Sequence, residues 1–226
     1  MLQLVIGNKN YSSWSMRPWV LMKHFGIAFD EIRLRFDFTP GSAFYRELAC
    51  HTPTGKVPVL RVDGFAVWDT LAIVETLADL HPQLAIWPRE WQPRARARSL
   101  CAEMHAGFGA LRQHAPMNIE ASLPEVGARL MRENDAVQRD LARIDSLWGE
   151  QLAVGGGPFL FGEFGAADAY FAPVAARVRT YDLPVSAASR AYIARLWSSP
   201  GVAAWVADAL AERDFLDFEE PYRRAP

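Results

Sequence analysis

The stretch KVPVLRVDGFAVWDT, residues Lys56–Thr70, decides the fold of this chain. Two apolar runs flank Asp63-Gly64, a dipeptide that tight hairpin turns favour because both residues tolerate a positive φ. Asp69-Thr70 then offers capping side chains at the start of a segment with helical periodicity. The stretch therefore predicts an antiparallel hairpin that leads directly into a helix.

The residues before the hairpin alternate between strand-like and helix-like patterns. Leu2–Ile6 is a short apolar run typical of a buried strand, and Ser15–Phe25 has helical spacing and stops at Gly26. Ala28–Leu34 alternates as a second strand, and Pro40–Ala49 predicts a short helix. The order β-α-β-α-β-β-α predicts a small mixed sheet with the hairpin at its edge.

The rest of the chain is helical in period and follows a linker rich in proline and tryptophan. The predicted helices cover Arg94–Met117, Pro124–Leu152, Ala167–Tyr181, Ser189–Trp197 and Pro200–Glu212. We expect the tail, Asp214–Pro226, to run extended over the surface. The sequence thus predicts an α/β domain over residues 1–80, a linker over 81–92 and an all-helical domain over 93–226.

Composition excludes several classes of function. The net charge is −2 with no basic stripe, so we expect neither nucleic acid nor an anionic membrane as a partner. The N-terminal residues lack the features of a signal peptide, and no apolar run reaches the length of a membrane helix. Cys50 and Cys101 are far apart and are interpreted as buried small hydrophobic residues, with no metal site. These features favour a cytoplasmic protein.

Hydroxyl side chains cluster where the first strand meets the first helix, in Tyr11-Ser12-Ser13-Trp14-Ser15. The unpaired N–H groups and the dipole of a helix N-terminus favour an anion there. The alternative is that these serines only cap the helix. Dithiol redox chemistry is excluded, since Cys-x-x-Cys is absent from this junction.

Two further motifs have both a structural and a ligand-binding interpretation. Pro58 at the start of a strand can mark a cis bond that presents the Val57 backbone to an extended peptide, or it can be a plain edge-strand proline. Asp69 and Thr70 can cap their helix, or they can receive the ammonium and carboxylate groups of a substrate. A third motif, Gly165 to Asp168, is a helix-start box with a structural role.

Taken in order and spacing, these motifs make the chain resemble the cytosolic glutathione transferases over nearly its whole length. It is closest to bacterial members of the serine-type classes, including the zeta class with maleylacetoacetate isomerase activity. Residues Ser12–Arg17 resemble the zeta pattern Ser-Ser-Cys-Ser-Trp-Arg, with Trp14 where that class has its cysteine. Val57-Pro58 matches the cis-proline of the family, and Asp69-Thr70 matches the pair that holds the γ-glutamyl group. Asp168 matches the acid of the helix-start box, where Gly165 replaces the usual Ser or Thr.

The resemblance implies a thioredoxin-like domain with a mixed four-stranded sheet, followed by a helical bundle. It also implies glutathione as co-substrate, a small electrophile as second substrate and a homodimer. Ser12 is then the expected thiol activator, with Ser13 in reserve and Tyr11 third. The glutathione-binding residues implied by the resemblance are Lys56, Val57, Pro58, Asp69 and Thr70. No metal is required.

We expect the second substrate to lie between the domains, against the first helix of the helical half. Candidate residues for that pocket are Trp14, Met104, His105, Phe108 and Arg112. His105 and Arg112 would suit an acidic substrate, whereas Met and aromatic residues at helical spacing are also typical of a core. The predicted function is conjugation or isomerisation of a small electrophile. The alternatives are a non-catalytic glutathione-binding scaffold and a glutathione-dependent peroxidase.

Overall fold

The computed structural model describes residues 1–224, and within them the strands form one mixed four-stranded sheet. The strands are β1 (Leu2–Ile6), β2 (Asp30–Arg33), β3 (Val59–Val62) and β4 (Phe65–Val67). Their order is β2-β1-β3-β4, with β1 parallel to β2 and antiparallel to β3. Asp63 and Gly64 both have a positive φ, as the predicted β3–β4 turn requires.

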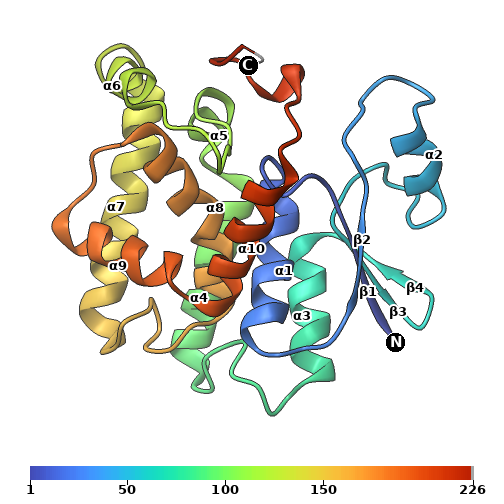
Figure 1. Cartoon of the computed structure of the whole chain (residues 1–226). Helices are drawn as coiled ribbons and strands as arrows, with labels where there is room; N and C mark the ends of the chain where they lie inside the picture. The colour runs from blue at the N-terminus through green and yellow to red at the C-terminus, as the bar shows by residue number, and fades with distance from the viewer. Residues whose placement is uncertain (225–226) are drawn as a thin grey trace.

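Helices cover both faces of this sheet (Figure 1). Helices α1 (Ser13–His24) and α3 (Thr70–Leu80) lie on the face toward the helical domain, and α2 (Ala43–Ala49) lies on the opposite face. A small apolar cluster that includes Phe44 and Leu48 joins α2 to the sheet. The main core lies on the α1 and α3 side and continues into the helical domain. The predicted thioredoxin-like domain followed by a helical domain is thereby confirmed.

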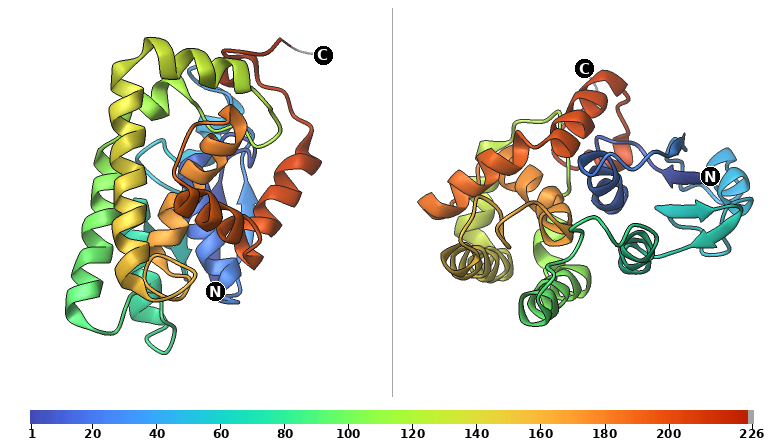
Figure 2. Two further views of the ribbon diagram at one scale, coloured as in Figure 1. Left: turned by 90° about the vertical axis from the view of Figure 1, so that its left-hand side faces the viewer. Right: turned by 90° about the horizontal axis from the view of Figure 1, so that it is seen from below.

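The helical domain is built around α8, almost all of which is buried. Its helices are α4 (Trp91–Ala106), α5 (Gly109–His114), α6 (Pro124–Glu133), α7 (Asp135–Gly155), α8 (Ala166–Tyr181), α9 (Ala187–Trp197) and α10 (Pro200–Glu212). Helix α1 packs against both α8 and α10, so the first helix of the sheet domain belongs equally to the interface between the domains. The view from below shows α1 and α3 between the sheet and the helical bundle (Figure 2).

Both long predicted helices are interrupted, which corrects the sequence-based boundaries. The segment expected over Arg94–Met117 begins at Trp91 and breaks between α4 and α5, where Phe108 adopts a left-handed conformation with φ 56°. The segment expected over Pro124–Leu152 breaks at Asn134, whose side chain accepts a hydrogen bond from Val137 N and starts α7 anew. The helical spacing of apolar residues continues through both breaks, and for this reason the sequence did not indicate them.

The tail and one cysteine also differ from expectation. The tail forms a short 3₁₀ turn, η1 (Asp217–Glu219), and is anchored by Leu216, which is 2% exposed, so it does not simply lie over the surface. The last two residues of the predicted tail lie outside the described residues. Cys101 is buried as expected, but Cys50 is exposed at the end of α2.

Candidate functional site

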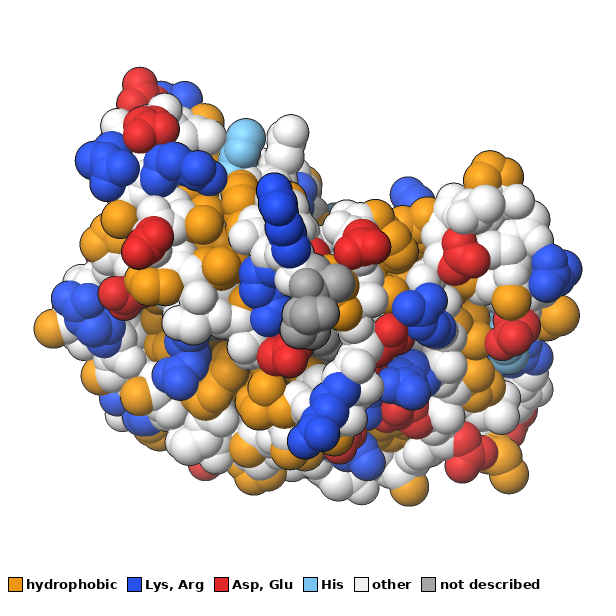
Figure 3. All heavy atoms as spheres, turned by 45° about the horizontal axis from the view of Figure 1, so that its top comes forward, with side chains coloured by type: hydrophobic (Ala, Val, Ile, Leu, Met, Phe, Trp, Pro, Cys, Tyr) orange, Lys and Arg blue, Asp and Glu red, His pale blue; other side chains and the backbone are white. Residues whose placement is uncertain are grey.

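A cavity of about 880 Å³ lies between the two domains and collects the sequence motifs. Its walls include Ser12-Ser13 at the start of α1, Lys56–Pro58 before β3 and Asp69-Thr70 at the start of α3. In the space-filling view the outline dips between the helical domain on the left and the α2 side on the right (Figure 3). Segments far apart in the sequence thus meet at one hollow.

The serine loop leaves hydroxyl groups beside the N-terminus of α1. Ser12 occupies the N-cap position, but its hydroxyl makes no capping bond to a backbone N–H of the helix. Its Oγ donates to Ser15 Oγ at 2.7 Å, and Ser15 Oγ also accepts a hydrogen bond from Gly7 N. Ser13 Oγ has no hydrogen-bond partner among residues 1–224. The interpretation of Ser12 as a simple cap is therefore wrong, and both Ser12 and Ser13 keep hydroxyls at the cavity wall.

Tyr11 also lines the cavity, but its hydroxyl is committed to the C-terminal tail. It donates to Glu220 Oε1 at 2.8 Å and accepts from Leu216 N at 3.4 Å. Burial, and after it the bond to Glu220, raises the pKa of Tyr11 to about 12. The phenol is thus a neutral group whose hydroxyl is already bound to the tail.

The residue before the cis-proline offers free backbone groups. The Val57–Pro58 peptide bond is cis, and neither the N–H nor the C=O of Val57 has a hydrogen-bond partner among the described residues. Both groups can therefore pair with the backbone of an extended peptide in the cavity.

Asp69 caps α3, and both Asp69 and Thr70 line the cavity. Asp69 Oδ1 caps α3 by accepting from Leu71 N at 3.2 Å, and Asp69 Oδ2 lies 3.2 Å from His105 Nε2. Thr70 Oγ1 accepts a hydrogen bond from Tyr170 at 3.0 Å. The start of α3, with its unpaired backbone N–H groups, therefore faces the cavity as a site for a carboxylate.

Two family models match this chain and between them cover most of it. The glutathione S-transferase N-terminal domain matches residues 11–80, and the glutathione S-transferase C-terminal domain matches residues 91–208. The chain belongs to the glutathione S-transferase family.

Among curated relatives, maleylacetoacetate isomerase from Rattus norvegicus is 28% identical over 99 residues, which is 44% of this chain and 45% of that protein. A probable maleylacetoacetate isomerase from Caenorhabditis elegans is 36% identical over 59 residues, or 26% of this chain and 28% of that protein. The matched region thus spans less than half of either relative.

Solved glutathione transferases share the fold over nearly the full chain. A glutathione transferase homologue from Burkholderia with bound glutathione has a TM-score of 0.70 and 23% identity, covering 94% of this chain and 99% of its own. A diazinon-metabolizing glutathione S-transferase from the silkworm Bombyx mori has a TM-score of 0.70 and 16% identity, covering 94% and 98%. At these identities the likeness concerns the fold alone.

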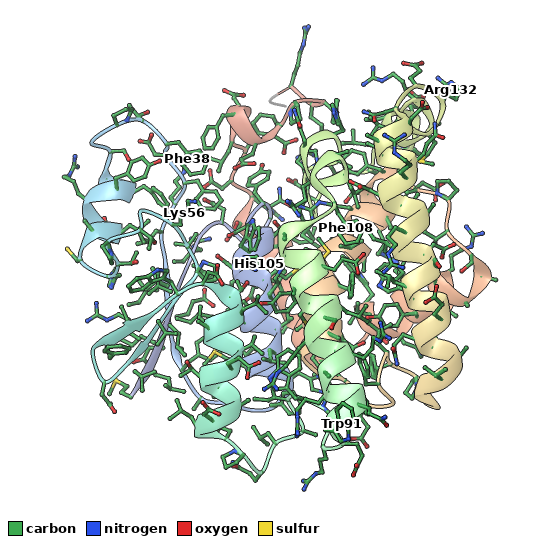
Figure 4. The ribbon with its side chains drawn as sticks, turned by 180° about the vertical axis from the view of Figure 1, so that it is seen from behind. Phe38, Lys56, Trp91, His105, Phe108 and Arg132 are labelled. Atoms are coloured by element: carbon green, nitrogen blue, oxygen red, sulfur yellow. The ribbon has the colours of Figure 1, made fainter. Side chains whose placement is uncertain are left out.

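In this glutathione S-transferase family member, the predicted second-substrate residues divide into two groups. Trp14, His105 and Arg112 line the cavity, with the Trp14 and His105 rings edge to face at 4.9 Å. Met104 and Phe108 do not line it, and are only 1% and 7% exposed within the core. Met104 lies on the face of α4 that packs on α8, and His105 is turned by about 100° from it toward α3 (Figure 4). Phe108 follows the end of α4, at the break before α5.

Sequence reasoning missed an arginine from α8. Arg177 is 3% exposed and lines the cavity, and its Nε and Nη1 donate to the carbonyls of Ala115 at 2.9 Å and Pro173 at 3.2 Å. Burial, and after it the nearby guanidinium groups of Arg17 and Arg112, lowers the pKa of Arg177 to about 9. A charged residue within the apolar run of α8 was the available signal, because such a residue is seldom buried without a role.

Arg17 adds a second buried cation behind the cavity wall. It is 1% exposed, lies over the rings of Trp14 at 4.1 Å and Tyr170 at 4.8 Å, and has no partner for Nε or Nη1 in residues 1–224. Burial lowers the pKa of Arg17 to about 10. No carboxylate among the described residues forms an ion pair with Arg17, Arg112 or Arg177.

Glu219 is a second cavity residue that the sequence did not indicate. It reaches the wall from η1 in the tail, and its carboxylate makes no hydrogen bond within residues 1–224. Burial, followed by repulsion from Glu220, raises the pKa of Glu219 to about 7.

In the described part of the chain, no group of three His, Cys, Asp or Glu side chains is placed to hold a metal ion. None of the described helices has the length and apolar character needed to cross a membrane.

Proposed function

We propose that this chain is a glutathione transferase that ionises the glutathione thiol and directs it at a small electrophile, in conjugation or isomerisation. The observation that carries this proposal is the meeting of Ser12-Ser13, the Val57 backbone and Asp69-Thr70 at one cavity. The relatives named as maleylacetoacetate isomerases, and the Burkholderia structure with bound glutathione, support it.

The cavity supplies a complementary group for each part of the tripeptide. Val57 N–H and C=O pair with the backbone of the cysteinyl residue, whose thiol then points toward the serine loop. Asp69 receives the γ-glutamyl ammonium, and Thr70 with the N-terminus of α3 receives the adjoining carboxylate. Lys56, exposed at the rim, offers a cation to the glycyl carboxylate.

The hydroxyl and the helix suffice to ionise the thiol. A cysteine-like thiol has a pKa of about 8.5, and lowering it by two units requires about 2.7 kcal/mol. A hydrogen bond to a charged group contributes about 1.5–3 kcal/mol, and a helix N-terminus about 0.3–1 kcal/mol. Rotation of the Ser15 hydroxyl lets it donate to Ser12 Oγ, so that Ser12 can donate its own proton to the thiolate.

We further propose that the electrophile carries a carboxylate. Arg112 and Arg177 line the cavity beyond the serine loop, and Arg17 lies behind Trp14. Burying unneutralised guanidinium groups is costly, and an anionic ligand would offset that cost with charge-assisted hydrogen bonds. Acidic substrates are consistent with the names of the curated relatives.

The test is a titration of glutathione with the wild type, Ser12→Ala and Ser13→Ala, following thiolate absorbance against pH. We expect the wild type to ionise the bound thiol near neutral pH, and Ser12→Ala to bind glutathione but ionise it about two pH units higher. The same shift in Ser13→Ala alone would assign the role to Ser13. A wild type that binds glutathione with its thiol protonated at neutral pH would be a scaffold, and absence of binding would overturn the proposal.

We also propose the domain boundaries, the oligomeric state and the cellular location of the protein. The proposed domains cover residues 1–80 and 93–226, with a linker over 81–92; the end of α3 at Leu80 supports the first boundary, and α4 begins at Trp91, two residues before the second. A homodimer in the cytoplasm follows from the family resemblance. Light scattering on the purified protein tests the dimer, and cell fractionation tests the location.

A further inference from the structure

Side chains of the helical domain hold both residues that begin α3. Tyr170, on α8, donates to Thr70 Oγ1 at 3.0 Å, and His105 Nε2, on α4, lies 3.2 Å from Asp69 Oδ2. Figure 4 shows His105 at the upper end of α4, on the side toward α3. The thiol-activating mechanism uses neither tyrosine nor histidine, so these contacts need another explanation.

The geometry around Thr70 fixes which way its hydroxyl points. Thr70 and Tyr170 are both 0% exposed, and the Tyr170 ring is also held by the guanidinium of Arg17 at 4.8 Å. A hydroxyl has one proton to donate and two acceptor positions. Because Tyr170 donates into Thr70 Oγ1, one acceptor position is filled, while no acceptor for the Thr70 proton is found among residues 1–224.

The phenol of Tyr170 is a permanent donor in this pair. Burial raises its pKa well above the ordinary range, so it stays protonated at any pH at which the protein is folded. In the structure this hydroxyl donates to Thr70 Oγ1. Thr70 lines the cavity, and its own proton is left for a ligand bound at the N-terminus of α3.

We propose that Tyr170 is a positioning residue that makes Thr70 a dedicated donor, and so makes the α3 site select a carboxylate over its amide. A carboxylate accepts the Thr70 proton and the helix N–H groups together. A primary amide brings its own N–H donors, which cannot pair with the helix N–H groups and find only one acceptor position left on Thr70. This inference rests on the proposed function, because the carboxylate concerned is that of the γ-glutamyl residue.

The contact between His105, on α4, and Asp69 positions the second of the two residues that begin α3. Asp69 Oδ1 is held by Leu71 N, and His105 faces Asp69 Oδ2, so the carboxylate is fixed at both oxygens. The α3 site is therefore completed by side chains from α4 and α8 of the helical domain.

The test compares two ligands and avoids the thiol altogether. The ligands are S-methylglutathione and its analogue in which the α-carboxylate of the γ-glutamyl residue is a primary amide, with Kd measured by calorimetry. We expect the wild type to prefer the carboxylate about tenfold or more, and Tyr170→Phe to weaken its binding about three- to tenfold. The Kd of the amide should change less than about twofold in Tyr170→Phe. A neutral amide gains little from the hydrogen bond between Tyr170 and Thr70, so it loses little when that bond is removed. Tyr170→Phe should have no further effect when added to Thr70→Val.

A matched control removes a buried tyrosine hydroxyl elsewhere. Tyr192 on α9 is 0% exposed and donates to Asp168 at 2.9 Å, so Tyr192→Phe should lower the Tm without changing the preference between ligands. Equal weakening of both ligands by Tyr170→Phe, or no weakening of either, would overturn the inference alone. Failure of the wild type to bind S-methylglutathione would overturn the proposed function and this inference with it.

Discussion

Ser12 Oγ lies 2.7 Å from Ser15 Oγ, and Ser15 Oγ accepts a hydrogen bond from the buried N–H of Gly7. The three groups form a chain that begins in the backbone after β1 and ends at the cavity. Ser12 is the donor to Ser15 in the structure, and because hydroxyl protons rotate, Ser15 can donate to Ser12 when Ser12 donates to a thiolate. Such a chain polarises the terminal hydroxyl, which strengthens its bond to an anion.

The Ser15→Ala substitution tests this chain. Loss of the donor behind Ser12 should raise the pKa of the bound glutathione thiol by about 0.5–1 unit, less than Ser12→Ala, because Ser12 still contacts the sulfur. Ser99→Ala is the control, since Ser99 is exposed on α4 and its Oγ donates only to Ala95 O. A thiol pKa equal to that of the wild type would show that Ser12 acts without Ser15.

Replacing Tyr11 by Phe should change stability without changing the chemistry. The Tyr11 hydroxyl connects Glu220 and Leu216 of the tail to the serine loop, so its loss should cost about 1–2 kcal/mol of unfolding free energy. The thiol pKa, measured by absorbance, should stay within about 0.3 unit of the wild type. An increase of about one unit or more would make Tyr11 the thiol activator.

Arg177→Met should affect acidic electrophiles selectively. The substitution keeps an apolar side chain of related length in α8 but removes the charge at the cavity. We expect the KM for a carboxylated electrophile to rise about tenfold or more, and that for its methyl ester to change less than about twofold. Arg179→Met is the control, because Arg179 is exposed on the same helix and lies over Trp197 at 4.6 Å. Equal effects on acid and ester would refute a carboxylate site at Arg177.

The carboxylate of Glu219 should give the cavity a pH dependence. Its pKa is raised to about 7, so Glu219 is largely neutral near pH 6 and largely charged near pH 8. The KM for an acidic electrophile, taken relative to its methyl ester, should therefore rise about three- to fivefold across that interval through like-charge repulsion. The ratio removes the contribution of the thiol, which titrates identically with both substrates.

Glu219→Gln should abolish the pH dependence of the KM ratio. It should also flatten the plot of unfolding free energy against pH. Because the folded-state pKa lies above the ordinary 4.5, the native protein holds more protons than the unfolded chain between pH 4.5 and about 7. The free energy of unfolding of the wild type should therefore fall across this window, and that of Glu219→Gln should fall less. Parallel profiles for the two proteins would mean that Glu219 titrates as an ordinary exposed carboxylate.

Local chemistry explains which parts of the fold were predictable. The Asp63-Gly64 turn and the Asp69 cap follow from the conformations and hydrogen bonds available to those residues alone, and both are found in the structure. The box at Gly165 is found as well, with Gly165 N donating to Asp168 Oδ2 at 2.9 Å. The breaks at Phe108 and Asn134 were missed because the apolar period is the same on either side.

The sequence by itself determined the order of elements and placed Ser12, Val57 and Asp69-Thr70 at the ends of strands and the starts of helices, because turns and caps act over a few residues. Only the tertiary structure decided which hydroxyls stay free, since Tyr11 is occupied by Glu220, more than 200 residues away. It also decided that Tyr170, Arg177 and Glu219 reach the same cavity. Those contacts depend on how α8 and the tail pack against the sheet domain, and no local spacing specifies that packing.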